Sequence, residues 1–203
     1  MYGMARIDLD VRSWLRHTTS ALMFAAAGWT VVAATAGGCD PAGAEGAGVV
    51  PEVAADVPAD FVPHTARGGG VQLKAPPAWA ETPTSGTVVL NLRTGRPGSS
   101  VNVVVVPATP GESLDGTMAK LPDQLAHEFA DFRLDKSEFV IVNDLPAGRL
   151  VYEASRHGFR GKLMQLVLKR NNRNYVLTYT AAPDRFDEEY PTVQQVVASL
   201  HVP

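Results

Sequence analysis

After residue 67, apolar and polar residues alternate in short runs, and the runs are separated by Gly-, Pro- and Asn-rich gaps. Alternation with a period of two is typical of strands that bury one face, so each run predicts a strand. The predicted strands are 71–73, 87–92, 101–106, 139–142, 150–154, 162–168 and 175–180. Within the third run, residues 103–106 are all valine. A strand without polar positions is typically covered on both faces, which we expect here.

Two other segments repeat their apolar residues at helical spacing. The first stripe consists of Leu114, Met118, Leu121, Leu125 and Phe129, and the second of Tyr190, Val193, Val197 and Leu200. Ser113 is the expected N-cap of the first helix. Pro122 is expected to kink or split this helix, and Pro191 is expected in the first turn of the second helix.

The gaps between the predicted strands are short. Thr94 to Gly98 predicts a hairpin turn, and the gaps after the first helix contain the Gly and Asn residues that tight turns require. Short connections join antiparallel neighbours. We therefore expect an α+β fold, in which an antiparallel β-sheet meander carries helices on both faces.

The first 38 residues have the three parts of a bacterial lipoprotein signal peptide. Arginines precede a stretch, residues 17–39, that contains no Asp, Glu, Lys or Arg, and Ala36-Gly37-Gly38 stands before the only cysteine, Cys39. We expect cleavage before Cys39 and a lipid on its sulfur that holds the protein to the bacterial cell membrane. An uncleaved membrane-spanning anchor is the alternative, since the stretch is about long enough to cross a bilayer. Asp40 favours the inner over the outer membrane.

Residues 39–66 are rich in Ala, Gly, Val and Pro and show neither strand nor helix periodicity. Such a segment buries too little apolar surface to offset its chain entropy, so we expect a flexible tether. The predicted organisation is a signal peptide over 1–38, a lipid-anchored tether over 39–66 and one domain over 67–203.

The domain's composition disfavours several classes of function. Residues 67–203 carry 15 Lys and Arg against 14 Asp and Glu, a net charge of +1 that does not indicate a nucleic-acid partner. The sequence has no Gly-x-Ser-x-Gly motif, its single cysteine is assigned to the lipid, and its histidines are scattered. We therefore expect no enzyme, no metal site and no cofactor. Asp184 and residues 187–189 could hold Ca²⁺ loosely, but a solvated helix start is the preferred interpretation.

One basic region is a candidate docking surface. Between residues 149 and 173, seven Lys and Arg residues accompany a single acid, Glu153. In a meander, alternate turns lie at opposite ends of the sheet, and four of these residues are expected at one end. They are Arg149, Lys169, Arg170 and Arg173. Such donors suit an acidic partner, and ordinary solvated turns are the alternative.

Two segments resemble the PsbP-like superfamily. They are Lys74-Ala75-Pro76-Pro77-Ala78-Trp79, and Tyr175 to Ala181 together with Val196 to Leu200. This superfamily includes a photosystem II extrinsic subunit, a Ran-binding nuclear import factor and bacterial DcrB-type envelope lipoproteins. The resemblance covers roughly residues 70 to 202 and implies an α-β-α sandwich that acts in binding or assembly. Trp79 is expected to plug the core rather than to stack on a ligand.

Two hypotheses for function follow. The first is a membrane-anchored envelope lipoprotein that acts as a non-enzymatic binding or assembly module for an unknown envelope protein. The alternative is a carrier or enzyme acting on a small or lipidic envelope ligand. A deep apolar pocket with converging polar groups would favour the alternative, and a filled sheet interior would favour the first hypothesis.

Overall fold

The computed structural model describes residues 55–203 except Gly69 and His157. Its elements are β1 (Val62–Thr65), β2 (Gln72–Ala75), β3 (Ala80–Glu81), β4 (Val88–Arg93), β5 (Ser100–Pro107), α2 (Leu114–Glu128), β6 (Ala130–Val142), β7 (Leu145–Arg156), β8 (Phe159–Arg170), β9 (Arg173–Ala181) and α3 (Phe186–Ala198).

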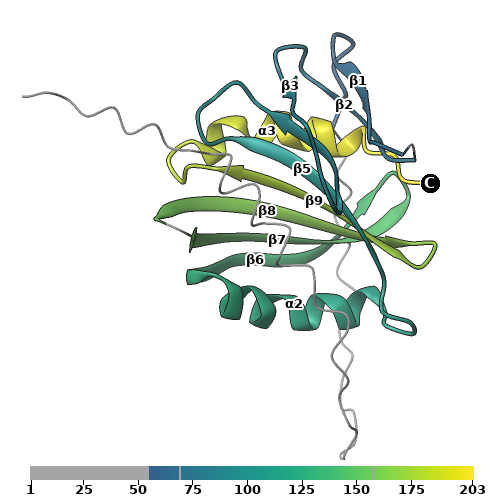
Figure 1. Cartoon of the computed structure of the whole chain (residues 1–203), viewed down its shortest axis with the longest axis vertical. Coiled ribbons are helices and arrows are strands. Elements are labelled where there is room, and N and C mark those ends of the chain that lie inside the picture. The colour runs from purple at the N-terminus through teal and green to yellow at the C-terminus, as the bar shows by residue number, and fades with distance from the viewer. Residues whose placement is uncertain (1–54, 69, 157) are drawn as a thin grey trace, which may run out of the picture.

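Seven strands form one antiparallel sheet in the order β3-β4-β5-β9-β8-β7-β6. Strands β6 to β9 follow one another as a meander, and β9 closes it against β5. Figure 1 shows this sheet between α3 on one side and α2 on the other. The expected α+β class, with a helix on each face, is confirmed.

The two faces of the sheet bury different apolar clusters. Val103 belongs to the cluster that includes residues of α3, and Val104 and Val106 belong to the cluster that includes residues of α2. All three are buried, as expected for a strand covered on both faces. We call these faces the α3 side and the α2 side.

Helix α2 begins as predicted. The Ser113 hydroxyl accepts a hydrogen bond from the N–H of Gly116 at 3.0 Å, and the predicted apolar stripe packs on the sheet. The expected split at Pro122 is wrong, because the helix is continuous through that residue. Proline removes one backbone donor, but the burial of Leu121 and Leu125 on either side of it holds the helix to the sheet.

Helix α3 begins at Phe186, one turn earlier than predicted, so Pro191 lies inside the helix rather than in its first turn. Phe186 is buried and its ring lies 5.0 Å from that of Tyr179 and 5.1 Å from that of Tyr190, centroid to centroid. These aromatic contacts fix the first turn of the helix against β9.

Regular structure begins before residue 67, the predicted start of the domain. Strand β1 pairs with β2, and Val62 lies opposite Ala75. Strand β2 and the residues that flank β1, Phe61 and Ala66, pack on the α3 side with Trp79, which is buried there as expected for a core residue. Cys39 and most of the predicted tether lie outside the described residues.

One buried acid joins the hairpin after β4 to helix α3. Glu189 is 8% exposed, and its carboxylate accepts hydrogen bonds from the Thr94 hydroxyl at 3.2 Å and the Tyr179 hydroxyl at 3.2 Å. Arg96 lies 3.0 Å away through its Nε. Burial and the Glu189 charge raise the pKa of Tyr179, so its hydroxyl stays a donor.

We expect Glu189→Ala to lower the free energy of unfolding by about 3 kcal/mol, because the change leaves the buried hydroxyls of Thr94 and Tyr179 without their acceptor. Glu188→Ala is the matched control. Its side chain is 49% exposed and pairs with Arg96 at the surface, so we expect little change. Urea denaturation of both variants measures the difference, and equal effects would contradict the assigned role.

Candidate functional site

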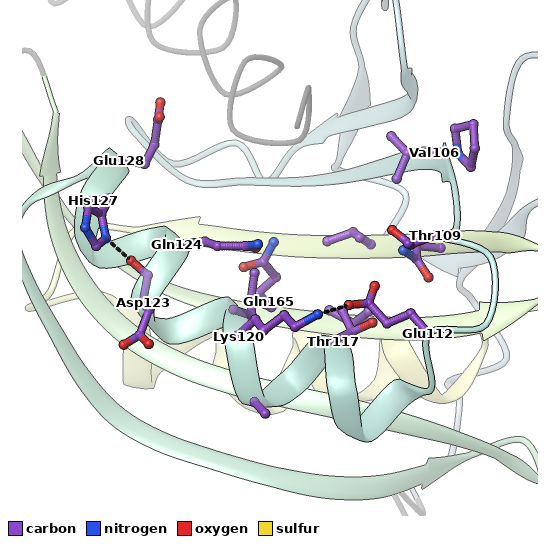
Figure 2. Close-up of a pocket in the computed structure, with 16 residues that line it drawn as sticks. Val106, Thr109, Glu112, Thr117, Lys120, Asp123, Gln124, His127, Glu128 and Gln165 are labelled. Atoms are coloured by element: carbon purple, nitrogen blue, oxygen red, sulfur yellow. Dashed lines mark hydrogen bonds and ion pairs between the residues drawn. The ribbon is translucent and has the colours of Figure 1, made fainter. Parts of the chain in front are cut away.

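A cavity of about 690 Å³ lies between α2 and the α2 side of the sheet. Figure 2 shows it from the side, with residues of α2 along one wall and residues of the sheet behind them. Its volume falls within the range of about 300 to 1,000 Å³ that is typical of small-molecule sites. We take this cavity as the candidate functional site.

Alternate residues of three neighbouring strands form the floor of the cavity. Because successive side chains of a strand point to opposite faces, β8 and β9 each contribute alternate residues, and β5 contributes its end, Val106 and Pro107. Among these are Gln165 and Val167 of β8, Asn174 and Val176 of β9, and Val106 of β5. The floor is thus a row of valines flanked by two amides.

The cavity exists because α2 covers only part of the sheet. Gly148 in β7 lies directly under Met118, and a Cβ atom at Gly148 would overlap the Met118 sulfur and lie 2.5 Å from its Cγ. The missing side chain lets the helix sit close to β6 and β7, which it contacts. The central strands β8, β9 and β5 are consequently left partly uncovered on this side.

Gln165 is the most buried polar group of the floor. It is 7% exposed, and its Oε1 accepts a long hydrogen bond of 3.5 Å from the Tyr152 hydroxyl. Burial raises the pKa of Tyr152, so this phenol remains a donor. With the amide oxygen turned to Tyr152, the amide N–H groups are left for an occupant of the cavity. Asn174 Oδ1 is also buried and has no hydrogen-bond partner within the described part of the chain.

One end of the cavity is closed by an ion pair. Lys120 of α2 lies 2.9 Å from the Glu112 carboxylate, and Lys169 of β8 donates a hydrogen bond to the Glu112 carbonyl. The hydrogen bond from Lys120 lowers the pKa of Glu112 below its ordinary value. This end therefore carries mutually satisfied charges rather than an unpaired one.

The other end carries His127 and Asp123, as Figure 2 shows. The His127 Nδ1–H donates to the backbone carbonyl of Asp123 at 2.7 Å, so its Nε2 is the ring nitrogen that can accept. Gln124 lies between the two ends and extends into the cavity.

The lining combines apolar side chains with amides, charged groups and two hydroxyls. It contains no serine or cysteine, and its two hydroxyls belong to Thr109 and Thr117. Thr117 donates to the Ser113 carbonyl at 3.1 Å, and His127 is engaged with Asp123 at the far end. Nucleophilic catalysis needs a nucleophile and a base within hydrogen-bond reach. The apolar floor with amide donors and acceptors can instead hold an uncharged, partly apolar group.

The structure separates the four basic residues predicted as a docking surface. Arg149 lies on the α3 side, where its Nε donates to Glu138 at 2.8 Å. Lys169 points to the α2 side toward Glu112. Arg170 donates to the Val202 carbonyl at 3.2 Å, and Arg173 is exposed at the β8–β9 turn. Only Arg170 and Arg173 share the turn, because a strand sends neighbouring side chains to opposite faces.

The other predicted groups do not form a site. Within the described residues no group of three or more His, Cys, Asp or Glu residues could hold a metal ion. Of the acids at the start of α3, Glu189 is buried in the contacts described above, and Asp187 is 82% exposed beside Lys162. None of the helices in the described residues is long and apolar enough to cross a membrane.

Sequence reasoning missed the cavity residues. Gln165 interrupts an otherwise apolar run, residues 163–168. A polar residue at a core-facing position is a signal that could have identified it as a candidate site residue. Gly148 gave no signal, since its role depends on the helix that packs above it.

The fold of this chain is similar to that of several solved structures. The chain is similar to the cyanobacterial PsbP protein CyanoP of Synechocystis sp. PCC 6803, with 15% identity, a TM-score of 0.58, and coverage of 82% of this chain and 98% of that one. It is also similar to LpqN of Mycobacterium tuberculosis, described as involved in cell envelope biogenesis, with 13% identity, a TM-score of 0.55, and coverage of 70% and 91%.

The Ran-binding protein Mog1p of Saccharomyces cerevisiae is similar at 11% identity and a TM-score of 0.53, with coverage of 70% and 95%. No protein-family model matches the chain, and no curated protein matches its sequence. At these identities the likeness concerns the fold, and the fold is PsbP-like, as the resemblance implied.

We expect Gly148→Ala to destabilise the protein by about 1 to 3 kcal/mol, because the added methyl forces Met118 and α2 away from β7. Gly116→Ala is the matched control. Residue 116 lies in the first turn of α2, where an added methyl comes no closer than 3.4 Å to a neighbouring side chain and helix propensity improves. Thermal unfolding of both variants checks this, and an unchanged melting temperature for Gly148→Ala would contradict the close packing.

Proposed function

We propose that the protein is a membrane-anchored envelope lipoprotein of the DcrB type that acts as a non-enzymatic binding module. The observation that supports the non-enzymatic module is the filled apolar core on the α3 side, whereas the cavity under α2, whose floor combines three valines with the buried amide of Gln165, supports the carrier considered below. A pocket with an apolar floor and a few convergent polar groups is the usual form of a binding site.

The anchor is supported by the sequence before the domain. Cys39 follows Ala36-Gly37-Gly38 and an uncharged stretch, which is typical of lipoprotein signals. The similarity of the fold to LpqN, which is described as an envelope biogenesis protein, is compatible with a place in the envelope.

A second candidate function is a carrier for a small or lipidic ligand. The size of the cavity favours it, since about 690 Å³ accommodates a small molecule. The α3 side, in contrast, is filled by the apolar core, so a carrier would use the α2 side alone.

We expect the mature protein to be recovered with the membrane fraction and to begin at a lipid-modified Cys39, and we expect Cys39→Ala to carry no lipid, because that sulfur is the proposed attachment atom. Cell fractionation measures the distribution, and mass spectrometry of the amino terminus identifies the lipid. An intact residue 1–38 segment on the mature protein would contradict lipidation and support the uncleaved anchor.

We expect Gln124→Trp to weaken partner capture, because the indole enters the cavity from an exposed position of α2. Ala126→Trp is the matched control, since residue 126 is exposed on the same helix but does not line the cavity. Crosslinked pull-down from the native envelope compares them with the parent. Loss of a protein partner in Gln124→Trp alone supports the binding module, and loss of a co-purified small molecule in native mass spectrometry supports the carrier. Equal behaviour of both variants would exclude the cavity as the site.

A further inference from the structure

Strand β6 is an open edge of the large sheet. It is last in the strand order and pairs with β7 on one side only. It is also the longest strand of the described chain, with 13 residues, and residues 133–137 are all exposed. An edge of this kind presents unpaired backbone N–H and C=O groups to which another strand can add.

The edge carries exposed apolar side chains. Leu134 and Phe139 are each 39% exposed and are two of the three large hydrophobic residues that the described chain exposes to this degree. They are five residues apart, a spacing that would normally place them on opposite faces. The register shift between Leu134 and Lys136 changes this, because Leu134 lies opposite Tyr152 and Phe139 lies opposite Gly148. Both therefore face the α2 side.

The edge also carries opposite charges on its α3 side. Lys136 lies 3.0 Å from Glu138, and their side chains are 58% and 17% exposed. The carboxylate of Glu138 also accepts a hydrogen bond of 2.8 Å from the Nε of Arg149, which lies opposite it on the neighbouring strand β7. Lys136 is thus an exposed cation of this edge, with its partner acid beside it.

We propose that β6 pairs with β6 of a second copy of this chain, antiparallel, with Ser137 opposite Ser137 of the second copy. Strands related by a two-fold axis pair in this way when the sequence around the axis is complementary to itself. In this register, Lys136 lies opposite Glu138 of the second copy and Glu138 opposite its Lys136. Opposite charges in cross-strand positions stabilise a pair of strands.

The apolar residues fit the same register. Two positions beyond the axis, Phe139 lies opposite Asp135, the residue at the register shift, and beside Leu134, which faces the same side. The pairing therefore covers both exposed hydrophobic residues of each copy. An aromatic ring against an aliphatic side chain is a favourable cross-strand contact.

Neighbouring registers are less favourable. An axis at Glu138 places two carboxylates opposite each other, which destabilises the pair. An axis at Phe139 leaves Lys136 opposite a valine, Val142, without a countercharge. The charges of β6 thus select one register, and they limit pairing with unrelated strands.

Disulfide crosslinking of the full chain in mild detergent tests this register. Ser137→Cys places two thiols at the axis, where paired Cα atoms lie about 4.5 to 5.5 Å apart, within the range that a disulfide spans. We expect a covalent dimer under mild oxidation. Ser85→Cys, an exposed serine far from β6 in the sheet order, is the matched control, and the parent reports any background from chains whose Cys39 carries no lipid.

A charge reversal tests the complementarity separately from the crosslink. Lys136→Glu places two pairs of carboxylates across the interface, and we expect about a tenfold lower rate of Ser137→Cys crosslinking at low salt. Circular dichroism establishes that the variant is folded. Crosslinking of Ser137→Cys no faster than of Ser85→Cys would overturn the proposal, as would a rate that Lys136→Glu leaves unchanged. Crosslinks to a different protein alone would overturn it too and assign the edge to that protein.

Discussion

The close contact between Met118 and Gly148 sets the layout of the α2 side. The Met118 side chain occupies the space that a Cβ atom at residue 148 would fill, so a glycine at this position of β7 leaves room for it. This contact holds α2 next to β6 and β7, while the cavity lies on the flank of the helix toward β8, β9 and β5. Its floor carries Gln165 and its valine neighbours, which are themselves buried.

The elements that could be predicted from the sequence are those whose signal is local. The four valines at 103–106 predicted burial on both faces, and the register of β5 sends alternate valines into the two clusters. The capping serine and the apolar stripe of α2 were equally readable, since both depend on spacing along one helix. Strands β1 and β3 were missed because they are four and two residues long, too short for alternation to be seen.

Gln165 apart, the surroundings of the buried polar and charged residues could not be predicted, because these residues are related through the packed structure. Glu189 falls on the buried stripe of α3 only once the helix begins at Phe186, and an acid next to Asp187 and Glu188 gives no sign of burial. Likewise, the basic residues of the meander were grouped by position along the strands, whereas the alternation of side chains divides them between faces. Which residues of a helix or strand face the core depends on where the element begins and how it is oriented, and both are set by tertiary contacts.

Both ends of the described chain leave the domain on the same face. Phe61, directly before β1, packs on the α3 side, and the C-terminal residues do so as well, with Val202 buried there and His201 bridged to Gln72. Figure 1 shows the C-terminus close to β1 and β2, away from α2. A surface that holds the protein by either terminus would therefore face the closed side of the sandwich. The cavity would then open on the side away from that surface, where molecules in solution can reach it.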